Sequence, residues 1–92
     1  MTRGTERPDE ELAVEAREGS EAAFRELVER FQGPVFSLLV RMVRRTELAE
    51  DLAQETFVKA WRALARFDPE RKFSSWLFKI AHNTALDALR RS

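Results

Sequence analysis

The sequence predicts an all-α domain, a compact bundle of about four helices, and three observations support this. Apolar residues recur at three- and four-residue intervals, which places them on one face of a helix. Capping residues and Gly or Pro breaks divide this pattern into four segments. No stretch alternates apolar and polar residues as a half-buried strand would. With 92 residues the chain has room for one small domain, which we expect at residues 9–92 behind a loose lead-in at residues 1–8.

The first two helices are delimited by short polar and Gly/Pro signals. Asp9 can cap the first helix, and Gly19 is expected to end it. Ser20 then starts the second helix, whose apolar residues keep helical spacing on both sides of Gly33-Pro34. Because proline cannot donate a backbone hydrogen bond and clashes with the preceding turn, this pair predicts a break or kink. The second half is apolar almost all round and should therefore be well buried.

A third helix should start with Thr46 as its cap and run to Phe67 without Gly or Pro. Its apolar face comprises Leu48, Ala49, Leu52, Ala53, Thr56, Phe57, Ala60, Ala63 and Leu64. The opposite face carries Glu47, Asp51, Gln54, Glu55, Val58 and Arg62. An apolar Val58 inside a polar rim is typical of a protein-docking patch, although a single exposed valine is also common on ordinary surfaces.

The final helix has two unlike faces. It follows the charged loop DPERK (68–72), with Ser74 as its expected cap and Phe73 and Phe78 at the spacing of a hydrophobic staple. The expected core face consists of Leu77, Phe78, Ala81, Thr84, Ala85, Ala88 and Leu89. The other face carries Trp76, Lys79, Ile80, Asn83, Asp87 and Arg90.

An aromatic ring among amides and cations predicts a surface on which unstacked bases lie against Trp76 while cations hold phosphates. Alternatively, Trp76 folds down over a helix edge and has no ligand.

Zero net charge conceals an asymmetry between the two parts of the chain. Residues 1–55 hold 13 acids and 8 bases, whereas residues 56–92 hold 3 acids and 8 bases. Opposite charge suggests a polyanion bound by the second part and a different partner bound by the first, although chance patterning would give the same picture. Arg41, with Arg44 and Arg45, forms a basic cluster that either ends a solvated helix or reaches nucleic acid.

The chemistry that an enzyme would need is missing. The chain has no Cys and a single histidine, His82, with no nucleophile or acid placed beside it. No His or Cys completes a metal set with the acidic residues, so we expect no catalytic site, metal or cofactor. No apolar run is long enough to span a membrane, and the N-terminus lacks a signal-peptide core. We therefore expect a cytoplasmic binding protein.

Two segments together resemble domain 2 of the bacterial extracytoplasmic-function (ECF) sigma factors of the sigma-70 family. AEDLAQETFVKAWRAL carries the pattern D-x-x-Q-E-x-F, and the following RFDPERKFSSWLFKIAHNTALDALRR carries W-L-x-x-I-A-x-N. The stretch GSEAAFRELVERFQGPVFSLLVRMVRR also fits the family, so that the resemblance covers roughly residues 9–91.

The resemblance implies a role for each exposed face. The D-x-x-Q-E helix would dock on the clamp helices of the RNA polymerase β′ subunit through Asp51, Gln54, Glu55, Val58 and Arg62. The loop and last helix would recognise the non-template strand of the −10 promoter element and hold the element melted, with one base flipped out. The matching positions are Phe67, Asp68, Lys72, Phe73, Ser74, Trp76, Lys79, Ile80 and Asn83, and the charge pattern adds Arg41 and Arg90.

The resemblance also implies further partners and a location. An anti-sigma factor commonly covers these surfaces, and complete members carry a helix-turn-helix domain for the −35 element, to which nothing here corresponds. Promoter selection by these residues alone should be weak, and the expected location is the cytoplasm, at the nucleoid. The alternative is an all-α protein–protein adaptor whose Trp76/Ile80 face receives a partner helix and never meets DNA.

Overall fold

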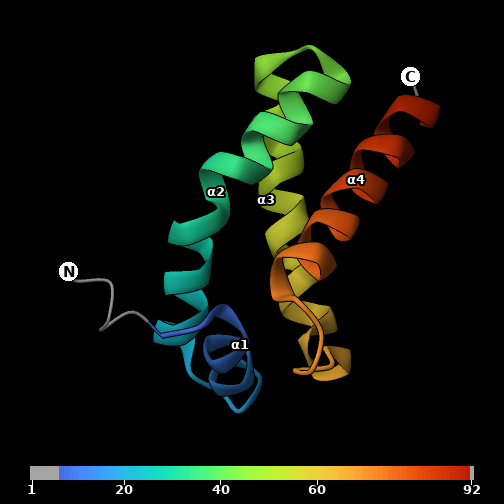
Figure 1. Cartoon of the computed structure of the whole chain (residues 1–92). Helices are drawn as coiled ribbons and strands as arrows, with labels where there is room; N and C mark the ends of the chain where they lie inside the picture. The colour runs from blue at the N-terminus through green and yellow to red at the C-terminus, as the bar shows by residue number, and fades with distance from the viewer. Residues whose placement is uncertain (1–6, 92) are drawn as a thin grey trace.

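The structure is a computed structural model that describes residues 7–91, so residues 1–6 of the expected lead-in lie outside the described residues. The helices are α1 (Asp9–Arg17), α2 (Glu21–Val43), α3 (Thr46–Ala63) and α4 (Phe73–Arg91), with a short 3-10 turn, η2 (Leu64–Arg66), after α3. Figure 1 shows α2, α3 and α4 running alongside one another, with α1 against the lower end of α2. The predicted all-α class is confirmed. Within the described residues no helix is both long and apolar enough to cross a membrane.

The helix α1 ends as expected but begins differently. Pro8 occupies the N-cap position and Asp9 lies inside the first turn, so the expected cap at Asp9 was wrong. Asp9 instead accepts a hydrogen bond from Arg30 of α2 at 2.8 Å, which ties the two helices together. At the other end Gly19 has a φ of +113°, a conformation that favours glycine and turns the chain into α2.

The helix α2 runs unbroken through Gly33-Pro34, so the predicted break was wrong. Figure 1 shows a bend near the middle of α2, which agrees with the alternative of a kink. Ser20 is the N-cap, and its Oγ accepts the Ala23 N–H at 3.0 Å, as expected. Beyond the proline only Val35, Leu39 and Val43 are buried, and the other apolar residues of this half are partly exposed, so the half is less buried than the sequence predicted.

The link between α2 and α3 is tight. Arg44 takes a left-handed conformation with a φ of 62°, and Arg45 occupies the N-cap position of α3. The expected cap at Thr46 was therefore one residue too late. The helix ends at Ala63 instead of running to Phe67, because the chain tightens into η2 before the loop.

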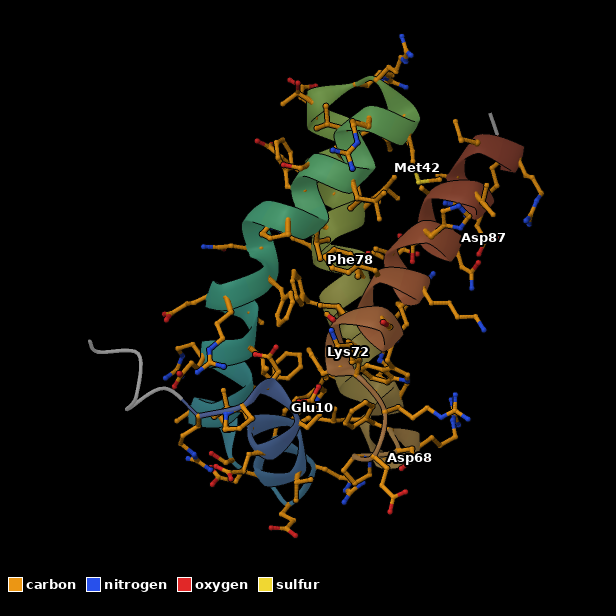
Figure 2. The ribbon with its side chains drawn as sticks, viewed as in Figure 1. Glu10, Met42, Asp68, Lys72, Phe78 and Asp87 are labelled. Atoms are coloured by element: carbon orange, nitrogen blue, oxygen red, sulfur yellow. The ribbon has the colours of Figure 1, made fainter. Side chains whose placement is uncertain are left out.

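The helix α4 also begins earlier than predicted, at Phe73 instead of after a Ser74 cap. Phe73 and Phe78 do not form the expected staple around a cap. Each packs against Phe31 of α2 instead, with ring centroids 5.6 Å and 6.1 Å away. Figure 2 shows Phe78 between α2 and α4. Most of the predicted core face of α4 is buried, except that Leu89 is 44% exposed.

The core also contains two hydroxyls that need partners. Thr56 and Thr84 are buried, and each donates to the carbonyl four residues earlier at 2.8 Å. Since an unsatisfied buried hydroxyl would destabilise the bundle, these bonds make both residues acceptable in the core.

Candidate nucleic-acid interface

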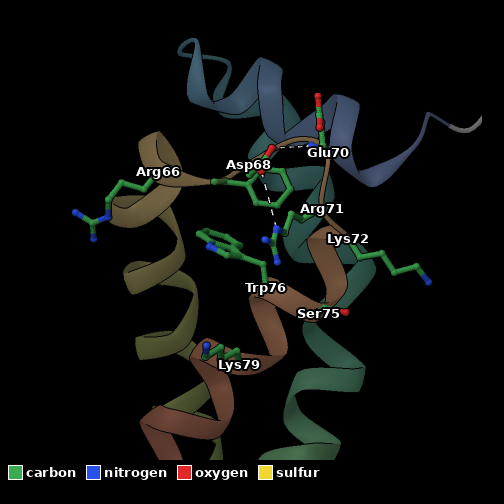
Figure 3. Close-up of a pocket in the computed structure, with 9 residues that line it drawn as sticks. Arg66, Asp68, Glu70, Arg71, Lys72, Ser75, Trp76 and Lys79 are labelled. Carbon is green, nitrogen blue, oxygen red and sulfur yellow. Dashed lines mark hydrogen bonds and ion pairs between the residues drawn. The ribbon is translucent and has the colours of Figure 1, made fainter.

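An open cavity of about 750 Å³ lies where η2, the loop after it and the start of α4 meet (Figure 3). It is lined by Arg66, Phe67, Asp68, Glu70, Arg71, Lys72, Ser75, Trp76 and Lys79. The cavity thus brings together five of the residues predicted to bind DNA. Its size falls within the range of about 300–1,000 Å³ that is usual for ligand sites.

Aromatic rings form the wall of this cavity. Trp76 is half-buried and packs against Phe67 and Phe73, with ring centroids 5.2 Å and 5.5 Å away. Phe67 is only 3% exposed and Phe73 only 1%, so their rings support Trp76 and offer little or no surface of their own. The alternative that Trp76 folds onto its neighbours is therefore correct for the buried part of the ring, and the exposed part of the ring lines the cavity.

The loop over the cavity is a hydrogen-bonded turn. The Arg71 N–H donates to the Asp68 carbonyl at 2.9 Å, and the Asp68 side chain accepts the Glu70 N–H at 3.0 Å. Pro69 stands at the second position of this turn, where its fixed φ is favourable. The turn leaves the side chains of residues 68–72 exposed around the cavity.

Cations surround the aromatic wall. Arg66, Lys72 and Lys79 are exposed, and no described residue forms an ion pair with them. Figure 3 shows Arg66 and Lys72 directed away from Trp76 on opposite sides of it. Arg71 is 3.9 Å from Asp68, but this exposed pair is weak. Sequence reasoning missed Arg66 and Arg71, although both belong to the basic segment around the loop.

A second hollow, of about 340 Å³, lies between α3 and α4. It is lined by Lys59, Arg62, Ala63, Arg66, Ile80 and Asn83. Asn83 is exposed and points away from the core, as predicted. Arg66 lines both hollows, so this second hollow, the groove between α3 and α4, adjoins the cavity. Together the groove and the cavity form a path lined by basic residues.

Other predicted residues lie outside both hollows. Arg41 lines a hollow on the α2–α4 side with Phe78, and Arg90 pairs with Asp87 at 3.0 Å on the exposed end of α4. Ser74 lines neither the cavity nor the groove, whereas Ser75 lines the cavity. The described residues contain no group of three or more acidic or histidine side chains that could hold a metal ion.

The predicted docking face of α3 is exposed along its length. Asp51, Gln54, Val58 and Arg62 are exposed, and Glu55 is half-buried beside Lys59, with which it pairs at 3.1 Å. Sequence reasoning missed Trp61, which is 42% exposed and packs edge-to-face with Phe24, their ring centroids 4.8 Å apart. Trp61, Val58 and Phe24 line an apolar hollow of about 390 Å³. The three-residue spacing from Val58 to Trp61 was the available signal.

The family model and the relatives that match this chain all belong to sigma factors. The family model for sigma-70 region 2 matches residues 27–92. The RNA polymerase sigma-H factor of Pseudomonas aeruginosa is 40% identical over 92% of this chain and 44% of its own length. The ECF RNA polymerase sigma factor SigW of Bacillus subtilis is 36% identical over 84% of this chain and 41% of its own length. The chain therefore spans less than half the length of these relatives.

Two solved structures have the same arrangement of helices. One is an engineered region 2 of sigmaE in complex with GTAAAA, with a TM-score of 0.89 and 42% identity over 99% of this chain and 93% of that one. The other is CnrH in complex with the cytosolic domain of CnrY, with a TM-score of 0.76 and 40% identity over 86% of this chain and 51% of that one.

Proposed function

The chain belongs to the sigma-70 region 2 family of ECF sigma factors, and from this premise we propose that it docks on RNA polymerase and binds the opened −10 promoter element. The observation that carries the proposal is the cavity around Trp76, an aromatic wall whose rim holds four cations and the two acids Asp68 and Glu70. The engineered region 2 of sigmaE supports it, because that domain was solved in complex with GTAAAA. Such a domain binds and does not catalyse a reaction, and it acts in the cytoplasm, at the nucleoid.

In this proposal a flipped base of the non-template strand enters the cavity and stacks on Trp76. Base–aromatic stacking contributes about 1–3 kcal/mol, and extruding a base costs a few kcal/mol. The free energies of stacking and of base extrusion nearly balance. Because Phe67 and Phe73 already hold the Trp76 ring in place, little side-chain entropy is lost on binding, which favours the complex. Asp68 and Glu70 at the rim can accept hydrogen bonds from exocyclic amino groups of the base.

The strand then continues along the groove between α3 and α4. Asn83 offers both a donor and an acceptor to a base edge, and Ile80 gives it an apolar neighbour. Arg62, Arg66 and Lys79 supply phosphate contacts, which add affinity but no sequence information. The basic path is therefore continuous from the flipped base to its neighbours.

The exposed face of α3 is the proposed contact with the β′ clamp helices. A polar rim of Asp51, Gln54, Glu55 and Arg62 surrounds the apolar Val58, and the apolar hollow that Val58 lines with Trp61 extends this face. A buried apolar centre surrounded by polar residues is the usual composition of such an interface. We also propose an inhibitory protein partner, an anti-sigma factor, because the related CnrH is found with the cytosolic domain of CnrY.

A fluorescence titration with single-stranded hexamers tests the DNA part of the proposal. In a Trp61→Phe background the emission reports on Trp76 alone, since the chain has two tryptophans. GTAAAA, its complement TTTTAC and single-base variants of GTAAAA are compared at several salt concentrations. We expect one strand and one base per position to be preferred, with a slope of log K against log salt of about −0.7 per phosphate contacted. Equal affinity for all hexamers, or no salt dependence, favours the protein adaptor instead.

A further inference from the structure

We propose that α1 sets the base preference of the cavity, with Glu10 and Arg17 as positioning residues. This inference rests on the proposed function, because it concerns how the same cavity is shaped. Neither residue lines the cavity, and both lie on a helix that precedes the residues matched by the family model, 27–92. Their contacts connect α1 to the loop from far away in the sequence.

The two contacts hold the two ends of the loop. The Arg17 guanidinium donates to the Phe67 carbonyl at 2.9 Å, across 50 residues of sequence. The Phe73 N–H donates to Glu10 Oε2 at 2.7 Å, across 63 residues. Figure 2 shows Glu10 directed from α1 toward the start of α4. The second bond involves a carboxylate at a helix N-terminus, where both the charge and the free N–H favour it.

The residues that α1 holds are the same two that support Trp76. Phe67 and Phe73 are buried, their ring centroids lie 5.5 Å apart, and both rings contact the indole of Trp76. A shift of either backbone would therefore move the wall of the cavity. Between these ends the hydrogen bonds of the described residues are local: the loop has its own turn, and the Trp76 N–H donates to the Lys72 carbonyl at 3.2 Å. The contacts from α1 therefore support the shape of the loop from outside this segment.

The helix α1 is itself anchored to α2. Arg30 of α2 donates to the Arg7 carbonyl at 2.6 Å and to Asp9 at 2.8 Å, and also to Glu26 at 2.7 Å. Burial by itself lowers the pKa of Arg30, but the hydrogen bonds and negative charges of Asp9 and Glu26 outweigh it and raise the pKa above its ordinary value. These contacts complete a continuous set of bonds from α2 through α1 to the loop.

The first test measures base preference. Glu10→Ala and Arg17→Ala are made in the Trp61→Phe background, and the ratio of affinities for GTAAAA and a hexamer of thymidine is measured. Loss of a charge-assisted hydrogen bond predicts that this ratio falls about five- to tenfold, while the salt slope stays unchanged because no phosphate contact is removed. Glu10→Gln, which keeps an acceptor oxygen, should restore part of the preference. An unchanged ratio in folded Glu10→Ala and Arg17→Ala proteins overturns the proposal.

Matched controls separate positioning from a general effect of charge or stability. Glu18→Ala and Arg25→Ala remove the same charges from exposed side chains that form no bond in the described residues, so both should keep the preference. Thermal unfolding identifies any variant that is not folded. Should Glu10→Ala fail to fold, Arg17→Ala gives the answer, because it breaks the other bond from α1 to the loop: a reduced preference supports the proposal and an unchanged one overturns it.

A second measurement needs no DNA and distinguishes this inference from the proposed function. Acrylamide quenching of Trp76 is compared between the Trp61→Phe protein and its Glu10→Ala variant. If α1 holds the loop, quenching increases in the variant; equal quenching overturns the inference. A parent protein that fails to discriminate among the hexamers, with quenching that still increases, would instead refute the proposed base recognition and leave the positioning role supported.

Discussion

The proposed docking face of α3 and the cavity beside Trp76 are built in opposite ways. The α3 face comes from one regular helix, and its exposed residues follow helical spacing from Asp51 to Arg62. The cavity combines η2, a six-residue loop and the start of α4, and α1 holds the loop at both ends. A surface on one helix depends on that helix alone, whereas the shape of the cavity depends on contacts across the whole bundle.

This difference predicts separable activities, and Trp76→Ala should show it most strongly. Removing the stacking surface is expected to lower the affinity for GTAAAA about 10- to 100-fold, while capture by a β′ clamp-helix fragment stays unchanged. Fluorescence-labelled DNA gives the first value and a pull-down the second. Trp61→Ala is the matched control, since it removes the same side chain from the docking face and should leave DNA binding intact. Loss of both activities in folded Trp76→Ala would show that the regions are not independent.

Gln54→Ala combined with Glu55→Ala tests the other region. The pair should weaken capture by the clamp-helix fragment about tenfold, because a few central residues dominate most interfaces, and should not change hexamer binding. Glu29→Ala, on the exposed face of α2, is the charge control. A DNA affinity that falls in parallel with clamp capture would contradict the division of the surface into two sites.

Asn83→Ala should have a smaller effect that is confined to specificity. Asn83 lines the α3–α4 groove and is exposed, so its loss leaves the fold intact. We expect discrimination at one base position to fall about fivefold, because an amide that can donate and accept at a base edge is lost, while total single-strand affinity changes little. The hexamer variants measure this directly. If every base preference survives, Asn83 does not contact a base.

The same contrast explains what the sequence could and could not predict. Helical spacing correctly predicted the exposed α3 face and the exposure of Asn83, because both depend only on position along one helix. It did not predict that Phe67 and Phe73 are buried beneath Trp76, since their burial depends on packing between separate segments. The bonds of Glu10 and Arg17 span 63 and 50 residues and leave no local pattern.

Errors at the helix ends have a related cause. Asp9, Thr46 and Ser74 were expected to cap helices from their side-chain chemistry, yet all three lie inside the helix. At α4 the first N–H is bound by Glu10 of another helix, so a local cap is not required there. Ser20 was predicted correctly, because its cap is formed within its own turn.

Arg62→Ala tests the place where the two regions meet. Arg62 belongs to the exposed face of α3 and also lines the groove with Asn83, and no described residue forms an ion pair with it. Its loss should therefore reduce both clamp capture and hexamer affinity, each by about two- to threefold, since an exposed charge contributes little to either. The salt slope for DNA should also become shallower if a phosphate contact is lost. Arg25→Ala, an exposed arginine on α2, should change neither activity. A large loss in one activity with none in the other would assign Arg62 to one region alone, either the α3 face or the DNA-binding groove.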